Sequence, residues 1–307
     1  MKARAGERVR LVEVGARDGL QNEPRTLAPE VRVQLLERLA DAGLSSVEAG
    51  AFVSPRWVPQ MAGTEQVFKA LAPRPGVRWA ALVPNLQGLD AAIAAGCQEV
   101  AVFTAASEAF AQKNINCSIA DSLARFAPVL AKAGDHGIRV RGYVSCVMGC
   151  PFSGAVAPDA VAAVSASLYG MGCYEISLGD TIGTGHPAAT HAVIDACAGR
   201  VPLDALAGHF HDTYGMAIAN VYAALEAGVR VFDSAVAGLG GCPYSPGATG
   251  NVATEDVIYL LDGLGFEHGV NLEALIATGA FISQALGRDT ASRVARAVLA
   301  QRAGADC

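Results

Sequence analysis

Apolar, β-branched runs alternate along nearly the whole chain with segments in which apolar residues recur at helical spacing. The runs predict strands at Val9–Val14, Ser46–Ala49, Val77–Val83, Glu99–Thr104, Ile138–Cys146, Cys173–Leu178, Leu206–His211 and Val229–Val236. The intervening segments predict helices at Pro29–Ala42, Thr64–Leu71, Leu86–Ala95, Ile119–Ala133, Pro158–Tyr169, Pro187–Ala198, Met216–Ala227 and Thr254–Leu264. Strict alternation of this kind is typical of a parallel sheet with right-handed crossovers.

Eight strand–helix units in succession favour a closed barrel over an open sheet. The sequence therefore predicts the α/β class and a (β/α)₈ TIM barrel with extra C-terminal helices. No proline-rich, serine-rich or charged linker divides the chain. We expect a catalytic barrel domain over residues 8–275 and a helical appendage over residues 276–307 that is not a separate domain.

Composition excludes several classes of protein. Of the 307 residues, 52% are hydrophobic and 17% are charged, which is not typical of a disordered chain. A net charge of −6 argues against a nucleic-acid partner, which favours a basic surface. No stretch of about 18 apolar residues predicts a membrane span. The basic segment 1–10 is too short for a targeting peptide, so we expect a cytoplasmic protein without a membrane partner.

The eight cysteines are spread along the chain, and no pair has C-x-x-C spacing. Seven of them fall in or beside expected strands and helices. This distribution indicates structural thiols in a reducing compartment rather than a disulfide framework or a zinc site.

Polar residues gather where the expected strands end, which is where the active sites of such barrels lie. His209 and His211 alternate on one strand, so both imidazoles face the same side. With Asp18 after the first strand, they form a ligand set for a divalent cation. A set of mixed nitrogen and oxygen ligands favours Mg²⁺ or Mn²⁺ over structural zinc. The alternative is two histidines held only by hydrogen bonds.

Arg17 precedes Asp18, directly after the first apolar strand. The pair could form a plain surface ion pair. Alternatively, the guanidinium reaches the barrel mouth and stabilises a developing oxyanion, which is the role we predict.

Residues 238–251 contain five glycines and two prolines around Cys242. One interpretation is a flexible connector. The other is a mobile flap that carries the thiol over the site as a proton donor or nucleophile. A second glycine-rich segment, Gly183–Ala188, matches G-x-G-x-x-A, but it lacks the acidic residue that a dinucleotide site needs. We interpret it as a tight turn between a strand and a helix.

Several segments together resemble the 3-hydroxy-3-methylglutaryl-CoA lyases, within the larger group of divalent-metal barrel lyases, aldolases and Claisen-type synthases. The resemblance extends from about Val12 to about Asp256 and more weakly to Val298. Its motifs are Arg17–Glu23, Phe52–Met61, Lys113–Ser118, Gly142–Cys146 and, most specifically, Val236–Tyr244 around Cys242. Leu20 stands where the synthases usually have Glu, which favours the lyases.

The resemblance implies a set of roles at matching positions. It implies that Asp18, His209, His211 and Asn251 bind Mg²⁺ or Mn²⁺. It implies that Arg17 and Gln21 bind the acyl-CoA substrate and that Arg17 stabilises the enolate. The implied catalytic residues are Arg17, Asp18, Glu48, Asp180, His209 and Cys242.

The implied reaction is cleavage of 3-hydroxy-3-methylglutaryl-CoA to acetyl-CoA and acetoacetate, as in leucine degradation, by a homodimer. Either His209 or Asp18 could take the proton of the tertiary hydroxyl group. One alternative is a related 3-hydroxyacyl-CoA lyase or a Claisen-type synthase acting on another acyl group. A second alternative is a barrel that binds metal without turnover, which the complete residue set argues against.

Overall fold

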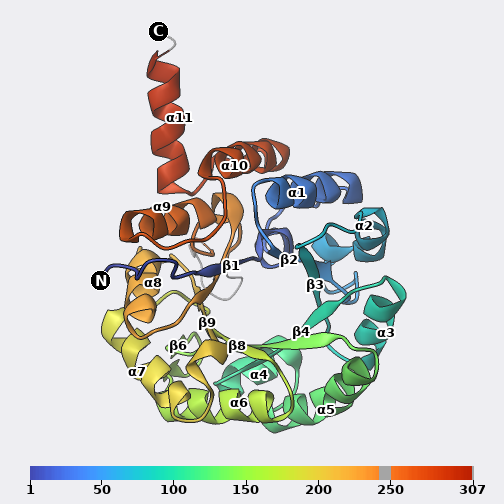
Figure 1. Cartoon of the computed structure of the whole chain (residues 1–307). Helices are drawn as coiled ribbons and strands as arrows, with labels where there is room; N and C mark the ends of the chain where they lie inside the picture. The colour runs from blue at the N-terminus through green and yellow to red at the C-terminus, as the bar shows by residue number, and fades with distance from the viewer. Residues whose placement is uncertain (242–249, 306–307) are drawn as a thin grey trace.

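Eight parallel strands close into a barrel in the order β1-β10-β9-β8-β5-β4-β3-β2 (Figure 1). The computed structural model describes residues 1–241 and 250–305. The barrel strands are β1 (Arg10–Glu13), β2 (Ser46–Ala51), β3 (Arg78–Leu82), β4 (Glu99–Ala105), β5 (Arg139–Ser145), β8 (Glu175–Asp180), β9 (Leu206–Phe210) and β10 (Val231–Ser234). The predicted (β/α)₈ barrel is confirmed.

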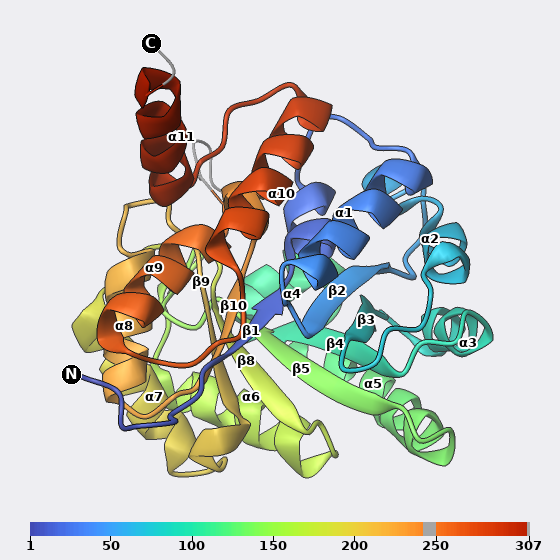
Figure 2. The ribbon, with the colours of Figure 1, turned by 45° about the horizontal axis from the view of Figure 1, so that its top comes forward.

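A ring of helices surrounds the barrel (Figure 2). Its members are α1 (Pro29–Asp41), α2 (Thr64–Ala70), α3 (Leu86–Ala94), α5 (Ile119–Asp135), α6 (Pro158–Gly170), α7 (Pro187–Ala198), α8 (Ala217–Glu226) and α9 (Thr254–Leu264). Proline begins three of them, where its missing N–H group costs no helical hydrogen bond. Ser118 and Asp121 form a capping box at the start of α5. These signals explain why the predicted helix starts agree with the structure.

Some short elements were not predicted. They are α4 (Glu108–Ile115), the hairpin of β6 (Gly149–Cys150) and β7 (Gly154–Ala155), the π-helical turn η1 (Gly15–Gly19), and the 3₁₀ turns η2 (Pro59–Met61), η3 (Leu203–Ala205) and η4 (Val236–Gly238). Helix α4 is capped by the Ser107 hydroxyl group but buries only Phe110 and Ala111. Two buried positions are too few to produce a helical period in the sequence.

Two helices follow the barrel, namely α10 (Leu272–Leu286) and α11 (Arg293–Ala305). Helix α10 is continuous from its Asn271 cap, so the expected division at residues 275 and 276 falls inside it. It packs against α1 and η4. Helix α11 extends away from the rest of the molecule in both views (Figures 1 and 2).

The inside of the barrel is polar, although its strands are apolar overall. In β5, a Cβ atom at Gly142 would meet Leu168 and Cys173, so the even-numbered side of this strand faces the helices. Arg141 and Tyr143 therefore lie on the opposite, inner side, where both are buried. The helix-facing side is apolar and carries most of the core.

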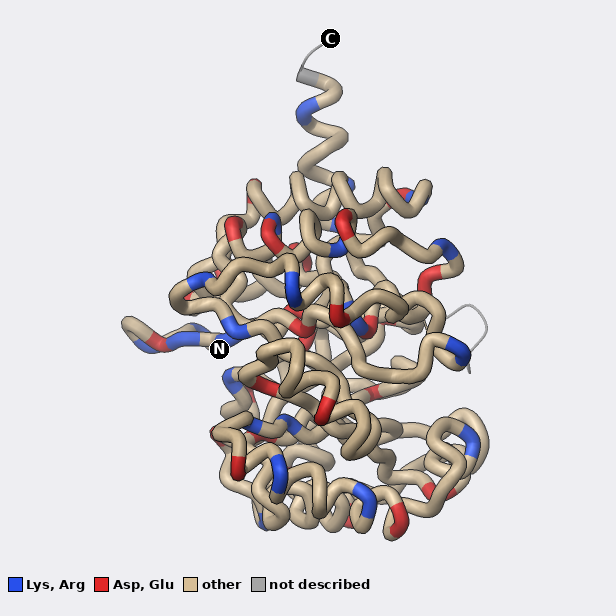
Figure 3. The backbone as a smooth tube through the Cα atoms, turned by 90° about the vertical axis from the view of Figure 1, so that its right-hand side faces the viewer, with Lys and Arg blue, Asp and Glu red and all other residues tan. Residues whose placement is uncertain are grey.

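Charged residues of both signs are interspersed along the backbone (Figure 3). Among the described helices, none is long and apolar enough to span a membrane.

Candidate active site

The turn that follows β1 brings two adjacent charged residues into the barrel mouth. Arg17 and Asp18 belong to η1, which buries Arg17 to 6% exposure. A Cβ atom on the neighbouring Gly19 would lie 2.6 Å from the Cβ of Leu239. Only glycine permits this close approach, so the packing of Gly19 fixes the position of the turn.

Asp18, His209 and His211 come together as a cluster that could hold a metal ion. One ligand atom from each residue lies within 4.8 Å of the others. The Nε2 atoms of the two histidines are 3.2 Å apart, and that of His209 is 3.9 Å from Asp18 Oδ2. A carboxylate with two imidazoles is a suitable donor set for a divalent cation. The predicted residues are thus adjacent in space, as a metal site would require.

Asn251, also expected to be a ligand, lies beside this cluster. The backbone of Asn251 forms an isolated antiparallel β-bridge with that of His211. The Nδ2 atom of Asn251 donates hydrogen bonds to Asp18 Oδ2 at 2.9 Å and to the Leu239 carbonyl at 3.2 Å. In this arrangement the amide nitrogen faces Asp18. The amide oxygen would have to turn toward the cluster to bind a cation.

Arg17 is held by two carboxylates and is not a surface ion pair. Its Nε atom donates to Glu48 Oε2 at 2.6 Å, and its Nη1 atom donates to Asp18 Oδ1 at 2.7 Å. The guanidinium also lies 5.4 Å from the centre of the Tyr143 ring. Glu48, on β2, is almost fully buried. These contacts hold the guanidinium beside Asp18.

A second buried network holds His209. Its Nδ1 atom lies 3.0 Å from Asp233 Oδ2, so the hydrogen bond leaves Nε2 facing Asp18 and His211. Asp233 accepts two hydrogen bonds from Arg141, at 2.7 and 3.0 Å, and one from Ser177 at 2.7 Å. A carboxylate behind a histidine fixes the tautomer and orientation of the ring.

The two networks join through Tyr143. Arg141 Nη1 donates to the Tyr143 hydroxyl group at 2.9 Å, and this hydroxyl group donates to Glu48 at 3.5 Å. The resulting chain of contacts closes on itself across η1, β2, β5, β9 and β10. It runs through Asp18, Arg17, Glu48, Tyr143, Arg141, Asp233 and His209.

The pKa values of the titratable residues in and beside this ring are shifted in different directions. Burial alone would raise the pKa of Asp18, but the Arg17 charge and the two histidines lower it to about 2. Burial raises the pKa of Glu48 despite the Arg17 charge. Burial would lower the pKa of His209, but Asp233 raises it. Burial and the neighbouring His209 lower the pKa of His211 to about 4, which favours a neutral imidazole.

Asp180 ends β8 and is fully buried. Its Oδ2 atom accepts a hydrogen bond from the Gly185 amide at 2.9 Å, and burial raises its pKa to about 6. Gly183 has a φ of +67°, and a Cβ atom on Gly185 would lie 2.0 Å from Met148 Sδ. The glycines of this segment therefore make a tight turn around Asp180, which agrees with the interpretation made from the sequence.

A pocket of about 230 Å³ opens beside the metal-ligand cluster. Its polar lining includes Arg17, Asp18 and Gln21, so the structure brings Gln21 to the site. Its apolar lining consists of side chains of Val53, Val58, Leu82, Phe103 and Phe110. Cys242, the expected catalytic thiol, lies outside the described residues.

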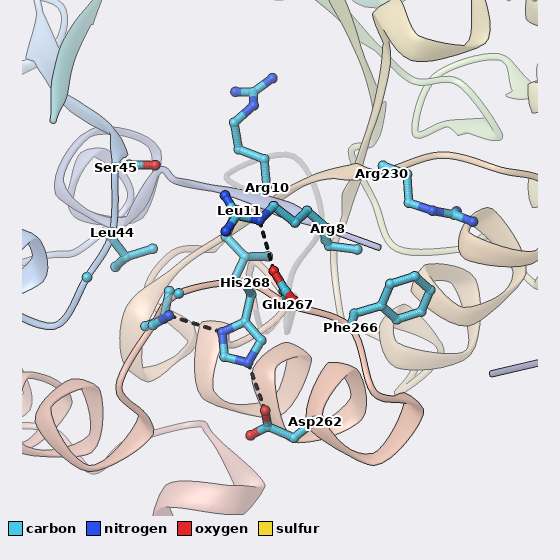
Figure 4. Close-up of a pocket in the computed structure, with 14 residues that line it drawn as sticks. Arg8, Arg10, Leu11, Leu44, Ser45, Arg230, Asp262, Phe266, Glu267 and His268 are labelled. Carbon is cyan, nitrogen blue, oxygen red and sulfur yellow. Dashed lines mark hydrogen bonds and ion pairs between the residues drawn. The ribbon is translucent and has the colours of Figure 1, made fainter. Parts of the chain in front are cut away.

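Larger cavities occur elsewhere. One of about 680 Å³ lies at the opposite end of the barrel, where β1, β2 and β10 begin. Figure 4 shows that its charged side chains pair with one another, Glu267 with Arg8 and Asp262 with His268. Because these charges already have partners, and the described residues form no metal-ligand cluster at this end, we place the candidate site at the other end.

Sequence reasoning missed Tyr143, Arg141 and Asp233. Each is a polar residue inside an apolar strand, and Arg141 and Tyr143 occupy alternate positions of β5. A buried charge in a strand must find a partner. This signal was present in the sequence, but it does not identify the partner.

Comparisons with known proteins identify the family of this chain. The model of the HMGL-like family matches residues 8–282. The hydroxymethylglutaryl-CoA lyase of Pseudomonas mevalonii is 63% identical, covering 96% of this chain and 98% of that protein. The 3-hydroxy-3-isohexenylglutaryl-CoA/hydroxy-methylglutaryl-CoA lyase of Pseudomonas aeruginosa is 59% identical with the same coverage. The crystal structure of hydroxymethylglutaryl-CoA lyase from Pseudomonas aeruginosa is 58% identical, has a TM-score of 0.95, and covers 96% of this chain and 99% of that one. The resemblance seen in the sequence is confirmed, and the chain belongs to the HMGL-like family.

Proposed function

We propose that this protein cleaves 3-hydroxy-3-methylglutaryl-CoA to acetyl-CoA and acetoacetate. The observation that carries the proposal is the presence of Arg17, Asp18, His209 and His211 in one pocket. Relatives at 63% and 59% identity with hydroxymethylglutaryl-CoA lyase in their names support this choice over a synthase or a lyase for an unrelated acyl group.

A divalent cation fits the donor set. Two imidazole nitrogens 3.2 Å apart cannot both accept a hydrogen bond from each other, so a cation between them satisfies both lone pairs. Asp18 adds a negative charge, and Asn251 adds an amide oxygen once its side chain turns. Mg²⁺ and Mn²⁺ suit such mixed ligands. When bound, the cation lowers the pKa of the substrate hydroxyl group.

Arg17 would bind the thioester oxygen. Cleavage of the C2–C3 bond leaves an enolate on the acetyl-CoA portion, and its negative charge lies on this oxygen. Glu48 and Asp18 occupy two donors of the guanidinium, while none of the described residues accepts from its Nη2 atom. That donor remains for the substrate, and its position is fixed before the charge develops, as electrostatic stabilisation requires.

Two protons must move. The tertiary hydroxyl group loses one as C3 becomes a ketone carbon, and we assign it to the pair of Asp18 and His209, which both line the pocket. The enolate carbon must gain one, and we assign its delivery to Cys242 on the basis of the family resemblance. A Cys242→Ser variant should fold and retain metal but turn over at least about 10²-fold more slowly, because an alcohol is a much weaker acid.

We assign Glu48 and Asp180 a role in positioning other parts of the site, and neither is assigned a proton transfer. Glu48 fixes Arg17, and Asp180 orders the turn after β8. Gln21 lines the same pocket, which supports a role in binding a substrate oxygen.

We also propose a homodimer in a reducing compartment such as the cytoplasm. The projecting helix α11 supports a second subunit, since a helix of this length has few partners within the described chain (Figure 2). Six described cysteines are buried, and no disulfide joins any two of them, which is compatible with a reducing compartment. Light scattering on the purified protein tests the subunit number.

The decisive experiment is turnover of 3-hydroxy-3-methylglutaryl-CoA by metal-free protein with and without added Mg²⁺ or Mn²⁺. We expect acetoacetate release only with the metal. Comparing turnover across a panel of CoA thioesters, including the 3-hydroxy-3-isohexenylglutaryl-CoA analogue, defines which acyl group the protein prefers. Absence of acetoacetate from the methyl substrate, with release of a different product from another thioester, would overturn the assignment.

A further inference from the structure

Arg32 is a buried cation that no described carboxylate neutralises. It lies in the first turn of α1, and none of its surface is accessible. Arg17 and Arg141, which are also buried, form ion pairs with carboxylates, whereas no Asp or Glu of residues 1–241 and 250–305 forms one with Arg32. Burial lowers the pKa of Arg32 to about 10, so the guanidinium remains charged at neutral pH.

The placement of this charge opposes folding. A charge taken out of water needs an opposite charge to offset its lost hydration. The Nε atom of Arg32 is also buried without a hydrogen-bond partner among the described residues. A methionine side chain of similar length would carry neither burden. Features that oppose stability in this way are expected where function requires them, so the contacts of Arg32 indicate its role.

The guanidinium of Arg32 joins β2 to the start of α2. Its Nη1 atom donates a hydrogen bond to the Ala62 carbonyl at 2.9 Å. Its Nη2 atom donates to the Thr64 hydroxyl group at 3.2 Å and to the Ala49 carbonyl at 3.4 Å. Ala49 belongs to β2, Thr64 is the first residue of α2, and these two elements pack against each other and against α1 (Figure 1).

The contact with Ala49 falls at an irregularity of β2. The register of β2 against β3 shifts between Glu48 and Gly50, so Ala49 is an extra residue in the strand. A bulge of this kind bends the strand and redirects the side chains beside it. A Cβ atom on Gly50 would lie 2.8 Å from Nη2 of Arg32, so glycine allows the guanidinium to lie directly against the bulge.

Glu48 directly precedes this extra residue, and its Oε2 atom accepts the hydrogen bond from Arg17 Nε at 2.6 Å. The direction of the Glu48 side chain therefore depends on the shape of the bulge. We propose that Arg32 is a positioning residue that holds the β2 bulge so that Glu48 reaches Arg17. Arg32 is not among the residues that line the pocket, so it acts through β2. This inference rests on the proposed function, in which Arg17 binds the thioester oxygen.

Kinetics of single variants provide the first test. Arg32→Met should lower kcat for acetoacetate release by about 10- to 100-fold, as a displacement of about 1 Å in a reacting group does. Arg32→Lys, which keeps the charge and three donors for the same carbonyl groups, should restore most of the kcat. Arg38→Met makes the same substitution at an exposed position of α1 and is the matched control with wild-type kcat. Urea unfolding verifies that each variant folds, and Arg32→Gln replaces Arg32→Met if the latter does not.

A double variant separates positioning from a purely structural role. If Arg32 acts through Arg17, its loss has no further effect once Arg17 is replaced, so Arg17→Gln/Arg32→Met should have the kcat of Arg17→Gln alone. A purely structural role predicts independent effects, and the kcat of the double variant would then fall by the product of the two single effects. That result, or a wild-type kcat in Arg32→Met, overturns the proposal.

A crystal structure of the metal-loaded Arg32→Met variant tests the placement without turnover. We expect the distance from Arg17 Nε to Glu48 Oε2 to lengthen beyond about 3.2 Å, the upper end of the range for such a hydrogen bond. If this contact keeps its length of 2.6 Å, the proposal is wrong even in an active lyase. If the wild type releases no acetoacetate but the contact opens in the variant, the proposed reaction is wrong and the positioning role of Arg32 stands.

Discussion

Both ends of the barrel carry charged residues, but the surroundings of these charges differ. At the end where β1, β2 and β10 begin, Arg8 pairs with Glu267, and both are exposed; His268 pairs with Asp262, which is exposed. At the mouth, the charges are buried and each has several partners. Arg141, for example, binds Asp233, Glu175 and Tyr143.

The difference shows how a cavity and a site are distinguished. The larger cavity, at the first end, is surrounded by charges that neutralise one another in pairs (Figure 4). The smaller pocket at the mouth is surrounded by groups that hydrogen bonds hold in place, as Glu48 holds Arg17 and Asp233 holds His209. The potential ligand atoms of Asp18, His209 and His211 lie close to one another there. Preorganised groups of this kind can act on a substrate, because the protein has already met the cost of orienting them. Volume alone would have selected the end that lacks the clustered ligands of the candidate site.

The largest effect is expected from His211→Ala, which removes one of the three clustered ligands. We expect the purified variant to lose bound metal and acetoacetate production together. Metal analysis after dialysis against Mn²⁺ measures the first, and the lyase assay measures the second. His268→Ala, at the other end, is the control and should retain both. Full metal content in His211→Ala would remove this residue from the ligand set.

Arg17→Gln should reduce kcat by about 10²–10³-fold while metal binding is retained, because an amide keeps a hydrogen bond but loses the charge. Steady-state kinetics and metal titration measure the two properties. Arg8→Gln removes the same charge at the other end and should leave kcat unchanged. A near-normal kcat in Arg17→Gln would show that the buried guanidinium only neutralises Glu48 and Asp18.

Asp233→Asn should weaken metal binding by about 10- to 100-fold, the usual effect of losing a carboxylate behind a metal-binding histidine. The amide no longer compels His209 to keep its proton on Nδ1, and it loses the ion pair with Arg141. Calorimetric titration with Mn²⁺ measures the change. Ser177→Ala, which removes one hydrogen bond to the same carboxylate, should have a smaller effect. Equal affinities for wild type and Asp233→Asn would contradict the role of the ring in orienting His209.

The smallest effect is expected from Glu267→Gln. Its partner Arg8 is largely exposed, so the pair should contribute less than about 1 kcal/mol to the free energy of unfolding. Urea unfolding measures this value, and the lyase assay should show wild-type kcat. A loss of activity in Glu267→Gln would mean that the two ends of the barrel are coupled, against the contrast drawn above.

The sequence by itself determined the barrel and much of the candidate site. Apolar runs alternating with helical periods predicted all eight barrel strands, because burying one face of each element requires that pattern. The i, i+2 spacing of His209 and His211 predicted a shared face, because side chains on a strand alternate. Asp18 was expected nearby because the carboxyl ends of parallel strands meet at one end of the barrel.

Only the tertiary structure decided which buried groups form hydrogen bonds and ion pairs with these residues. No local pattern connects Arg141 with Asp233, which are 92 positions apart, or Arg17 with Glu48 on the next strand. Such pairings depend on barrel closure, since the stagger of the strands sets which inner side chains share a layer. The continuity of α10 past residue 275 depends on packing in the same way. Local patterns fix which face a residue occupies, whereas its partners follow from the three-dimensional arrangement of strands distant in sequence.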